Sequence, residues 1–483
     1  MKTFKILLTT IFSMLLFSCS EDIMDDINKD VNNALEMSAQ SMLPDAILKS
    51  SFETTGTDLA WYATVYIEHS AGTWAQSSDA DRRIGQTSDN VFGNNWNSLY
   101  DVLMILDDII KKTDPATGTE NNPYVRGIAQ ILTAYNLSVL TDMWGEVPWT
   151  EAIKGAEKLQ PKYDKQSQIY PKLFEYLDAG IASLNSATTF STTGDYIYGA
   201  SAATAKQKWI RAANSLKARY HMRLSRVDPT ASANAIADIA NGFTGAADNF
   251  VFAKYEATAT GENPWYQFLN DRTHLSVSKT LYDYMVARSD PRISAYFTQI
   301  GGLYVPAPNG SATESQGGKY SQSAITTNGR TAATPLMTYH ELKFIEAEAR
   351  FRNAPADLTW QTALRTAIEA NFVFHGLTAA QGTTYYNTSV VPRLTAGNQL
   401  NEILLQKWIG FYEHEAMEAY NDYRRVPSFL TLNNPNNNTA SGGFVWRLPY
   451  PTSEKASNSA NMPSINIFAD KVWWAGGNEI VTK

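Results

Sequence analysis

The residues that could carry out chemistry are few and scattered. The chain of 483 residues has one cysteine, Cys19. Its six histidines are His69, His221, His274, His340, His375 and His414. The sequence lacks the Gly-x-Ser-x-Gly elbow of hydrolases, the phosphate-binding loop of nucleotide hydrolases and the His-Glu-x-x-His helix of zinc proteases. We therefore predict no catalytic residues, no cofactor and no metal centre, and thiol catalysis by the body of the protein is excluded.

Two weaker alternatives involve acidic residues. His414 and Glu418 are four positions apart on a predicted helix, a two-ligand metal spacing that often arises by chance. Glycoside hydrolysis needs two carboxylates across a cleft. The carboxylates that come in groups are Glu346, Glu348, Glu413, Glu415 and Glu418. We interpret these carboxylates as solvated helix faces or partners of nearby arginines, which leaves a surface glycosidase as a minor alternative.

Cys19 follows a segment with the layout of a bacterial export signal. Lys2 and Lys5 precede an apolar run over 6–17, and the small residue Ser18 stands directly before Cys19. The run is too short to span a bilayer, and a leucine three positions before the cysteine is typical of a lipobox. We predict that residues 1–18 are a lipoprotein signal peptide and that Cys19 is lipidated, which would hold the protein on a membrane.

The mature chain divides into a tether and one large domain. Residues 19–37 are polar and acidic, which predicts a solvated tether, and residues 38–483 form the predicted domain. Removal of Lys2 and Lys5 with the signal takes the net charge from −8 to −10. An acidic chain with scattered lysine and arginine predicts no nucleic-acid partner.

Amphipathic segments joined by polar loops predict antiparallel helical hairpins. The expected pairs are 92–110 with 123–140, 169–184 with 209–224, and 336–351 with 359–374. No clean 34-residue repeat is present. The predicted fold class is mainly α, in which tetratricopeptide-like hairpins form a scaffold and long irregular loops build a ligand face.

The irregular segments hold the candidate ligand-binding residues. These segments are 186–201, 242–263, 301–335 and 433–443, and loop-rich stretches extend over 243–335 and 426–483. The chain has 12 Trp, 25 Tyr and 20 Phe, and aromatic rings in loops make flat platforms for sugars or peptides. The candidate platforms are Trp74, Trp265, Tyr266, Tyr304 and Tyr320. The alternative for each is that it only anchors its own loop.

Three motifs, taken together and in this order, resemble the SusD/RagB family, specifically its SusD-like branch. They are DMWGEVPWTEA over 142–152, the helix over 406–425 that contains EAYNDYRR, and RLPYPTSE over 447–454 with Asn458 four residues further on. The resemblance covers essentially the whole mature chain, including DINKD over 26–30. Tyr420 and Tyr423 fit the family's aromatic-Asn-Asp-aromatic pattern loosely.

The resemblance implies a lipid-anchored, surface-exposed protein of the outer membrane of a Gram-negative bacterium. It implies that the protein acts as a lid on a SusC-like TonB-dependent transporter, captures oligosaccharide or peptide for import, and catalyses no reaction. We expect the three motifs to be scaffold rather than ligand contacts. Arg424 and Arg425 end a predicted helix, and we expect them to bridge to Asp142 or Glu146.

Overall fold

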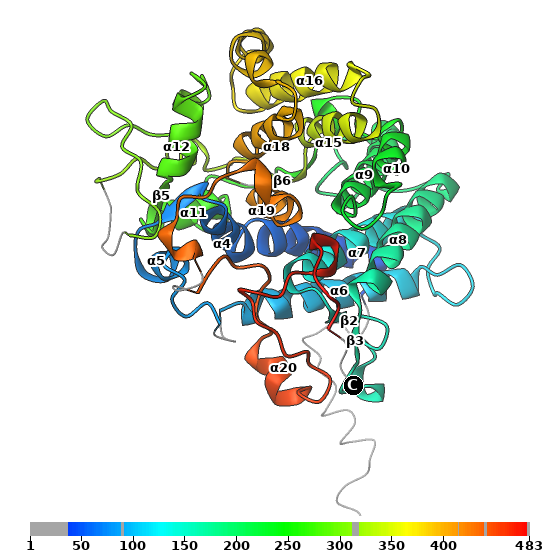
Figure 1. Ribbon diagram of the computed structural model, residues 1–483. Helices are drawn as coiled ribbons and strands as arrows, with labels where there is room; N and C mark the ends of the chain where they lie inside the picture. The colour runs from blue at the N-terminus through cyan, green and yellow to red at the C-terminus, as the bar shows by residue number, and fades with distance from the viewer. Residues whose placement is uncertain (1–36, 88–90, 312–317, 414, 439–441, 481–483) are drawn as a thin grey trace, which may run out of the picture.

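The computed structural model describes residues 37–87, 91–311, 318–413, 415–438 and 442–480, and it is mainly helical (Figure 1). The predicted signal peptide, Cys19 and all of the tether except Met37 lie outside these residues. Within the described ranges, no helix combines the length and the apolar character that crossing a bilayer requires.

The helices are distributed along the whole described chain. The α-helices are α3 (Ala39–Leu48), α4 (Asp58–Tyr66), α5 (Ala75–Asp81), α6 (Gly93–Lys112), α7 (Pro123–Trp144), α8 (Gln166–Ser186), α9 (Ala202–Arg223), α10 (Ala231–Ile239), α11 (Pro264–Asp271), α12 (Lys279–Val286), α13 (Ile293–Tyr296), α14 (Ile325–Asn328), α15 (Tyr339–Asn353), α16 (Thr359–Phe374), α17 (Ala379–Tyr385), α18 (Gln399–Gly410), α19 (Ala416–Arg425) and α20 (Thr452–Ser457). Two π-helical segments are η1 (Lys49–Thr55) and η4 (Tyr386–Val390). The 3₁₀ segments are η2 (Gly155–Glu157), η3 (Ala246–Asp248), η5 (Val391–Arg393), η6 (Pro427–Phe429), η7 (Pro435–Asn437) and η9 (Trp473–Ala475).

Among the described residues, six short strands form three antiparallel pairs. They are β1 (Ser70–Gly72) with β5 (Leu275–Val277), β2 (Val147–Pro148) with β3 (Tyr163–Asp164), and β4 (Phe250–Phe252) with β6 (Thr334–Met337). The register pairs Ser70 with Val277, Val147 with Asp164, and Phe250 with Met337. Each pair joins two segments that flank helices, so the strands fix loops onto the scaffold.

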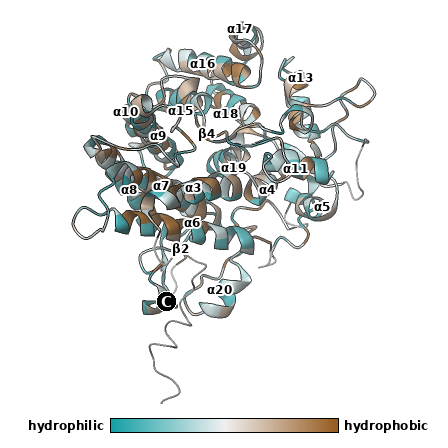
Figure 2. Cartoon of the chain, turned by 180° about the vertical axis from the view of Figure 1, so that it is seen from behind, coloured by the Kyte–Doolittle hydropathy of each residue, from teal (hydrophilic) through white to brown (hydrophobic). Residues whose placement is uncertain are grey.

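The helices form a stack in which each packs against the next. In order, α6, α7, α8, α9, α10, α15 and α16 are successive neighbours, and Figure 1 shows this series passing from the centre of the view to its right and upper edge. All three predicted hairpins are confirmed, as α6 with α7, α8 with α9, and α15 with α16. Seen from behind in Figure 2, the stacked helices show hydrophobic and hydrophilic stretches side by side, as expected for helices that bury one face.

Helix α7 is the centre of the larger of two hydrophobic clusters, and local signals set both of its ends. Asn122 accepts a hydrogen bond from the Val125 backbone N–H at 3.3 Å, and Pro123 occupies the first helical position. Gly145 ends the helix with a φ of +85°, a conformation that favours glycine. A second cluster lies among α12 and α15 to α18. Both ends of α7 are therefore set by residues that are adjacent in the sequence.

The carboxyl-terminal segment of the chain lies against the end of α7. The backbone N–H of Leu448 donates to the Met143 carbonyl at 2.8 Å, and Trp144 Nε1 donates to the Pro449 carbonyl at 2.9 Å. Arg447 is fully buried and donates from Nη2 to Glu146 at 2.8 Å. The motif stretches at 142–149 and 447–450 therefore pack as scaffold, as expected.

The two arginines at the end of α19 have partners different from those predicted. Arg425 forms buried ion pairs with Glu348 of α15 at 2.5 Å and with Asp422 at 2.8 Å. Arg424 donates to the Trp446 carbonyl at 3.0 Å and lies over the ring of Tyr420 at 4.2 Å. The prediction of bridges to Asp142 or Glu146 was wrong.

The two acids are paired with arginines from other elements. The carboxylate of Asp142 lies 3.5 Å from Arg223 of α9, and that of Glu146 lies 2.8 Å from Arg447. Adjacent arginines of α19 thus contact different parts of the chain, Arg425 helix α15 and Arg424 the segment at Trp446, which a single sequence does not reveal.

Candidate ligand-binding site

The structure separates the five candidate platforms by exposure. Trp74 is 41% exposed, whereas Trp265 is 1% exposed. Tyr266, Tyr304 and Tyr320 are half-buried. Exposure decides which rings can stack on a ligand, because a platform needs one face open to solvent.

Helix α11 explains why Trp265 and Tyr266 differ. Trp265, Phe268 and Leu269 follow helical spacing and turn into the core. The side chain of Asn263 caps the helix and accepts from the backbone N–H groups of Trp265 at 2.9 Å and Tyr266 at 3.1 Å. Trp265 is therefore a core residue rather than a ligand platform, which corrects the expectation from its place in an irregular segment.

Trp74 lies where β1 leads into α5. The backbone N–H of Thr73 donates to the His274 carbonyl at 2.8 Å, which extends the β1–β5 pairing by one step. Trp74 then precedes α5 in an extended conformation. Its indole is thus carried on a backbone fixed on both sides.

Tyr304 and Tyr320 lie on neighbouring backbone segments. The Ser321 N–H donates to the Val305 carbonyl at 2.8 Å, and the Val277 N–H of β5 donates to the Ser321 carbonyl at 2.9 Å. These segments therefore extend the same β1–β5 region that carries Trp74. In Figure 1, α5, β5, α11 and α12 lie together at the left, away from α8, α9 and α10.

Buried polar groups fasten these loops to one another. Glu68 accepts from the backbone N–H groups of Asn433 and Asn434, both at 2.8 Å. Asp81 accepts from the Gly310 N–H at 2.7 Å and from Asn434 Nδ2 at 2.8 Å. These bonds join three segments that are distant in sequence, at residues 68–81, 310 and 433–434. We call the surface that carries Trp74, Tyr304 and Tyr320 in this region the loop face.

A hollow of about 820 Å³, which we call the loop hollow, opens among other irregular segments. Two irregular segments predicted to be functional, 186–201 and 242–263, supply most of its lining. Leu48 of α3 and Phe52 and Glu53 of η1 supply the rest. Its volume lies within the range of small-ligand sites, roughly 300–1,000 Å³. The loop hollow is therefore large enough to hold part of an oligosaccharide.

Aromatic rings line the loop hollow. Tyr196 is 42% exposed. Tyr255 hydrogen-bonds through its hydroxyl with Thr334 at 2.8 Å, and its ring meets that of Phe252 edge-on at 5.0 Å. Phe52 of η1 is half-buried in the same lining. The hollow thus offers one accessible ring, that of Tyr196, and three rings that are more buried.

Charged groups surround these rings. Glu53, Glu256 and Glu262 line the hollow together with Lys254. Glu262 accepts from Arg330 Nε at 2.8 Å. Carboxylates accept hydrogen bonds and ammonium groups donate them, so the lining can satisfy ligand hydroxyls of either role.

Tyr266 adjoins the loop hollow through this ion pair. The Arg330 guanidinium lies 6.0 Å from the centre of the Tyr266 ring and pairs with the hollow residue Glu262. Trp74, Tyr304 and Tyr320 do not line the hollow. The structure therefore brings Tyr266 to its edge and leaves the other three on the neighbouring loop face.

The carboxylates considered for catalysis are mostly engaged with cations. Glu418 pairs with Arg223, and Glu346 pairs with Lys343 at 2.7 Å and with Arg350 at 2.7 Å. This confirms the interpretation as partners of basic side chains for Glu346, Glu348 and Glu418, whereas Glu413 accepts a hydrogen bond from Ser323. His414 lies outside the described residues, and among the rest no group of three or more His, Cys, Asp and Glu is placed to hold a metal ion.

Comparisons with known proteins agree on one family. The family model described as "Starch-binding associating with outer membrane" matches residues 32–451, and it is the SusD-like model. The chain belongs to the SusD/RagB family. No protein of curated function matches it significantly.

Solved structures share the fold over nearly the whole chain. A SusD/RagB family protein from Bacteroides thetaiotaomicron is 31% identical, with a TM-score of 0.83 over 92% of this chain and 100% of its own. A chitin-binding protein is 25% identical, with a TM-score of 0.75 over 91% and 100%. A chitin-binding SusD homologue from Flavobacterium johnsoniae, at 21% identity and a TM-score of 0.74 over 90% and 98%, shares the fold.

Proposed function

We propose that this SusD-like protein captures oligosaccharide at the outer membrane and hands it to a SusC-like TonB-dependent transporter, on which it acts as a lid. The observation that carries the proposal is the loop hollow of about 820 Å³, in which aromatic rings and charged side chains lie together. Sugar rings stack on aromatic faces, and their hydroxyls bond to carboxylates and ammonium groups. The family description and the chitin-binding neighbours favour a glycan over a peptide.

The proposed contacts fall into two groups. Tyr196 and Tyr255 would hold a sugar within the loop hollow, with Tyr266 at its edge. Trp74, Tyr304 and Tyr320 would contact a longer glycan on the neighbouring loop face. This arrangement suits a protein that binds oligosaccharides rather than single sugars.

Attachment completes the proposal. Cys19 would carry the lipid, and residues 19–37 would span at most about 68 Å when extended. A tether of this reach would let a lid swing open on the cell surface without leaving it. The protein would catalyse no reaction itself.

Calorimetric titration of the chain without its first 19 residues tests the proposal. Maltohexaose, chitohexaose and a basic and an acidic hexapeptide serve as probes, and chromatography of each mixture reveals any product. We expect saturable binding of a hexasaccharide without product. Binding of a peptide alone would favour the peptide-binding lid, and turnover of a glycan would favour the surface glycosidase.

The matched variants are Tyr196→Ala and Val373→Ala. Val373 is 51% exposed on α16 and lines none of the hollows described, whereas Tyr196 is 42% exposed in the loop hollow. Loss of a stacking anchor weakens binding by about 1–3 kcal/mol. Equal affinity of the two variants would contradict the placement of the ligand in the loop hollow.

A further inference from the structure

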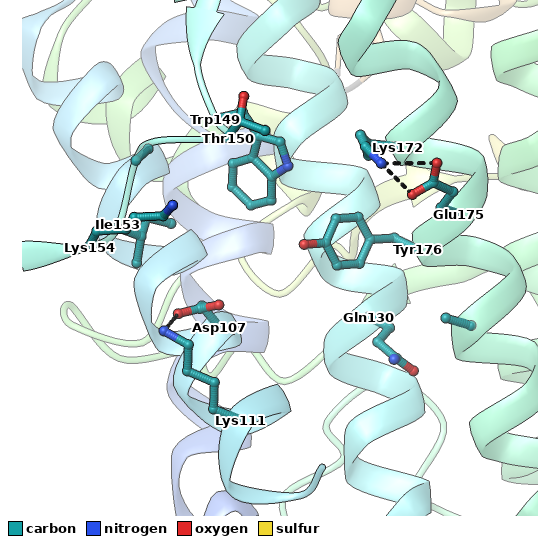
Figure 3. A pocket seen from close by; sticks show the side chains of 12 residues that line it. Asp107, Lys111, Gln130, Trp149, Thr150, Ile153, Lys154, Lys172, Glu175 and Tyr176 are labelled. Atoms are coloured by element: carbon teal, nitrogen blue, oxygen red, sulfur yellow. Dashed lines mark hydrogen bonds and ion pairs between the residues drawn. The ribbon is translucent and has the colours of Figure 1, made fainter. Parts of the chain in front are cut away.

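A second hollow, which we call the scaffold hollow, lies among the helices rather than the loops. It has a volume of about 520 Å³ and is bounded by α6, α7, α8 and the segment that follows β2 (Figure 3). None of its lining residues is shared with the loop hollow. It is therefore a separate feature, and the proposed function does not use it.

Two aromatic side chains form a corner in the scaffold hollow. The rings of Trp149 and Tyr176 lie 5.9 Å apart at 71°. Figure 3 shows both rings in the hollow, with the Tyr176 hydroxyl directed into the space between Trp149 and Asp107. A flat ligand ring can stack on one of these rings while its edge meets the other.

Their polar atoms are available to a ligand. Across the part of the chain that the structure describes, neither Trp149 Nε1 nor Tyr176 Oη has a hydrogen-bond partner. Neighbouring aromatic residues are satisfied internally, since Tyr100 donates to the Pro148 carbonyl at 2.6 Å and Tyr163 donates to Glu454 at 2.7 Å. Burial and the charges of nearby carboxylates raise the pKa of Tyr176 to about 12, so its hydroxyl is a donor at neutral pH.

Two ion pairs and one further lysine flank the aromatic corner. Lys111 pairs with Asp107 at 2.6 Å on α6, and Lys172 pairs with Glu175 at 2.8 Å on α8. Both pairs appear as dashed contacts in Figure 3. Lys154 also lines the hollow and has no ion-pair partner among the residues that the structure describes. The flanks therefore offer both hydrogen-bond donors and acceptors to the hydroxyls of a ligand.

The walls of the hollow are held rigidly. Asp164 accepts from the backbone N–H groups of Trp149 and Thr150, both at 2.8 Å. Helices α7 and α8 approach closely at Gly180, where a Cβ atom would lie 2.8 Å from Ile131. A preformed site loses less conformational entropy on binding than one that must be ordered.

We propose that the scaffold hollow is a second carbohydrate site, in which a neutral pyranose stacks in the Trp149–Tyr176 corner and bonds to the flanking charges. The inference rests on the proposed function, because it takes the ligand class from it. One long glycan, or two separate chains, would then contact the protein at both hollows. Two linked contacts raise the overall affinity without strengthening either site.

Fluorine NMR of protein labelled with 5-fluorotryptophan tests this inference. The chain without its first 19 residues keeps every described residue and all 12 tryptophans, and Trp149→Phe assigns the Trp149 signal. We expect chitohexaose or maltohexaose to shift that signal saturably. We expect Tyr176→Phe to raise the apparent Kd of the shift about 2- to 12-fold, as for loss of one hydrogen bond, with Val373→Ala unchanged.

The Tyr196→Ala variant separates this inference from the proposed function. If the two sites are independent, Tyr196→Ala weakens the calorimetric binding but leaves the Trp149 shift in place. A Trp149 signal that stays fixed while a hexasaccharide binds, or a shift that disappears in Tyr196→Ala, would overturn the second site alone. Absence of any hexasaccharide binding would overturn both proposals.

Discussion

The guanidinium of Arg447 fills the space in which a side chain at residue 145 would lie. A Cβ atom on Gly145 would be 2.6 Å from Nη2 of Arg447, and the same nitrogen donates to Glu146 at 2.8 Å. One interaction thus links the two motif stretches that begin at Asp142 and Arg447. It also explains why the first stretch needs glycine at its third position after Asp142.

Gly145→Ala should destabilise the protein by more than backbone strain alone. A positive φ costs a non-glycine residue about 1–2 kcal/mol. Displacement of Arg447 from Glu146 adds roughly 1.5–3 kcal/mol for a lost charged hydrogen bond. Urea unfolding measures the difference. Gly155→Ala is the control, since Gly155 also has a positive φ, of 54°, but no atom lies within 4 Å of its Cβ position. Equal losses in the two variants would contradict the steric role of Arg447.

Arg425→Met should be among the most destabilising substitutions in the helical scaffold. It leaves Glu348 and Asp422 without their shared arginine, and breaking a buried pair costs about 3–5 kcal/mol. Lys279→Ala, which breaks an exposed pair with Asp283, should cost only about 0.3–0.5 kcal/mol. The free energies of unfolding of both variants test this contrast. A loss of less than about 1 kcal/mol for Arg425→Met would show that the buried pair is dispensable.

Glu413→Gln should change how stability depends on pH. Burial raises the pKa of Glu413 to about 8, and Ser323 donates a hydrogen bond to its carboxyl group. Between about pH 5 and pH 8 the folded state holds a proton that the unfolded state has lost, so the wild type loses stability as pH rises, by up to about 1.4 kcal/mol per pH unit. Glutamine is neutral throughout, so the variant should gain stability relative to the wild type over this range. A constant difference from pH 5 to pH 8 would contradict a protonated Glu413.

Trp74→Ala should lower glycan affinity but not stability, whereas Trp265→Ala should lower stability. Trp74 is exposed, so its loss should lower glycan affinity by about 1–3 kcal/mol and leave unfolding nearly unchanged. Trp265 is buried, so its loss should lower stability by about 3–5 kcal/mol. Titration and urea unfolding of both variants give the four values needed. Unchanged affinity in Trp74→Ala would mean that its indole only anchors the start of α5.

Cys19→Ala should release a folded protein that still binds glycan. The proposed lipid is attached at residue 19, and both hollows lie within residues 48–262. Membrane fractionation should find the variant in the soluble fraction, and its affinity in solution should equal that of the chain without residues 1–19. Uptake by cells should fall. Continued membrane attachment would contradict Cys19 as the anchor.

The sequence was most informative about long helices, in which apolar residues recur at helical spacing over several turns. The three predicted hairpins are confirmed because apolar residues at helical spacing, such as Leu99, Leu103 and Leu106, have one stable solution, burial of a continuous face. The Asn122–Pro123 start of α7 is equally local, since capping depends on residues next to one another. Local chemistry thus predicted the scaffold.

The candidate ligand-binding residues were harder to predict from the sequence, because they come from distant segments that only the fold brings together. Segments 186–201 and 242–263, predicted to be functional, line the loop hollow, yet Tyr196 and Tyr255 within them were not among the candidate platforms. Trp265 misled because it stands in an irregular stretch of sequence but begins a short helix that turns it inward. The scaffold hollow was not foreseen, since Trp149 and Tyr176 come from a motif and from a helix that read as structural.

The contacts between the last segment and α7 also govern when this chain can fold. Asp142 accepts from Trp474 Nε1 at 2.8 Å, and Trp144 donates to Pro449, so α7 near the middle of the first half is completed by residues more than 300 positions later. A ribosome that has made the first three quarters of the chain has therefore made a core with its closing piece missing. Truncation from the carboxyl end would not yield a smaller folded protein, because residues among the final forty complete the packing around α7.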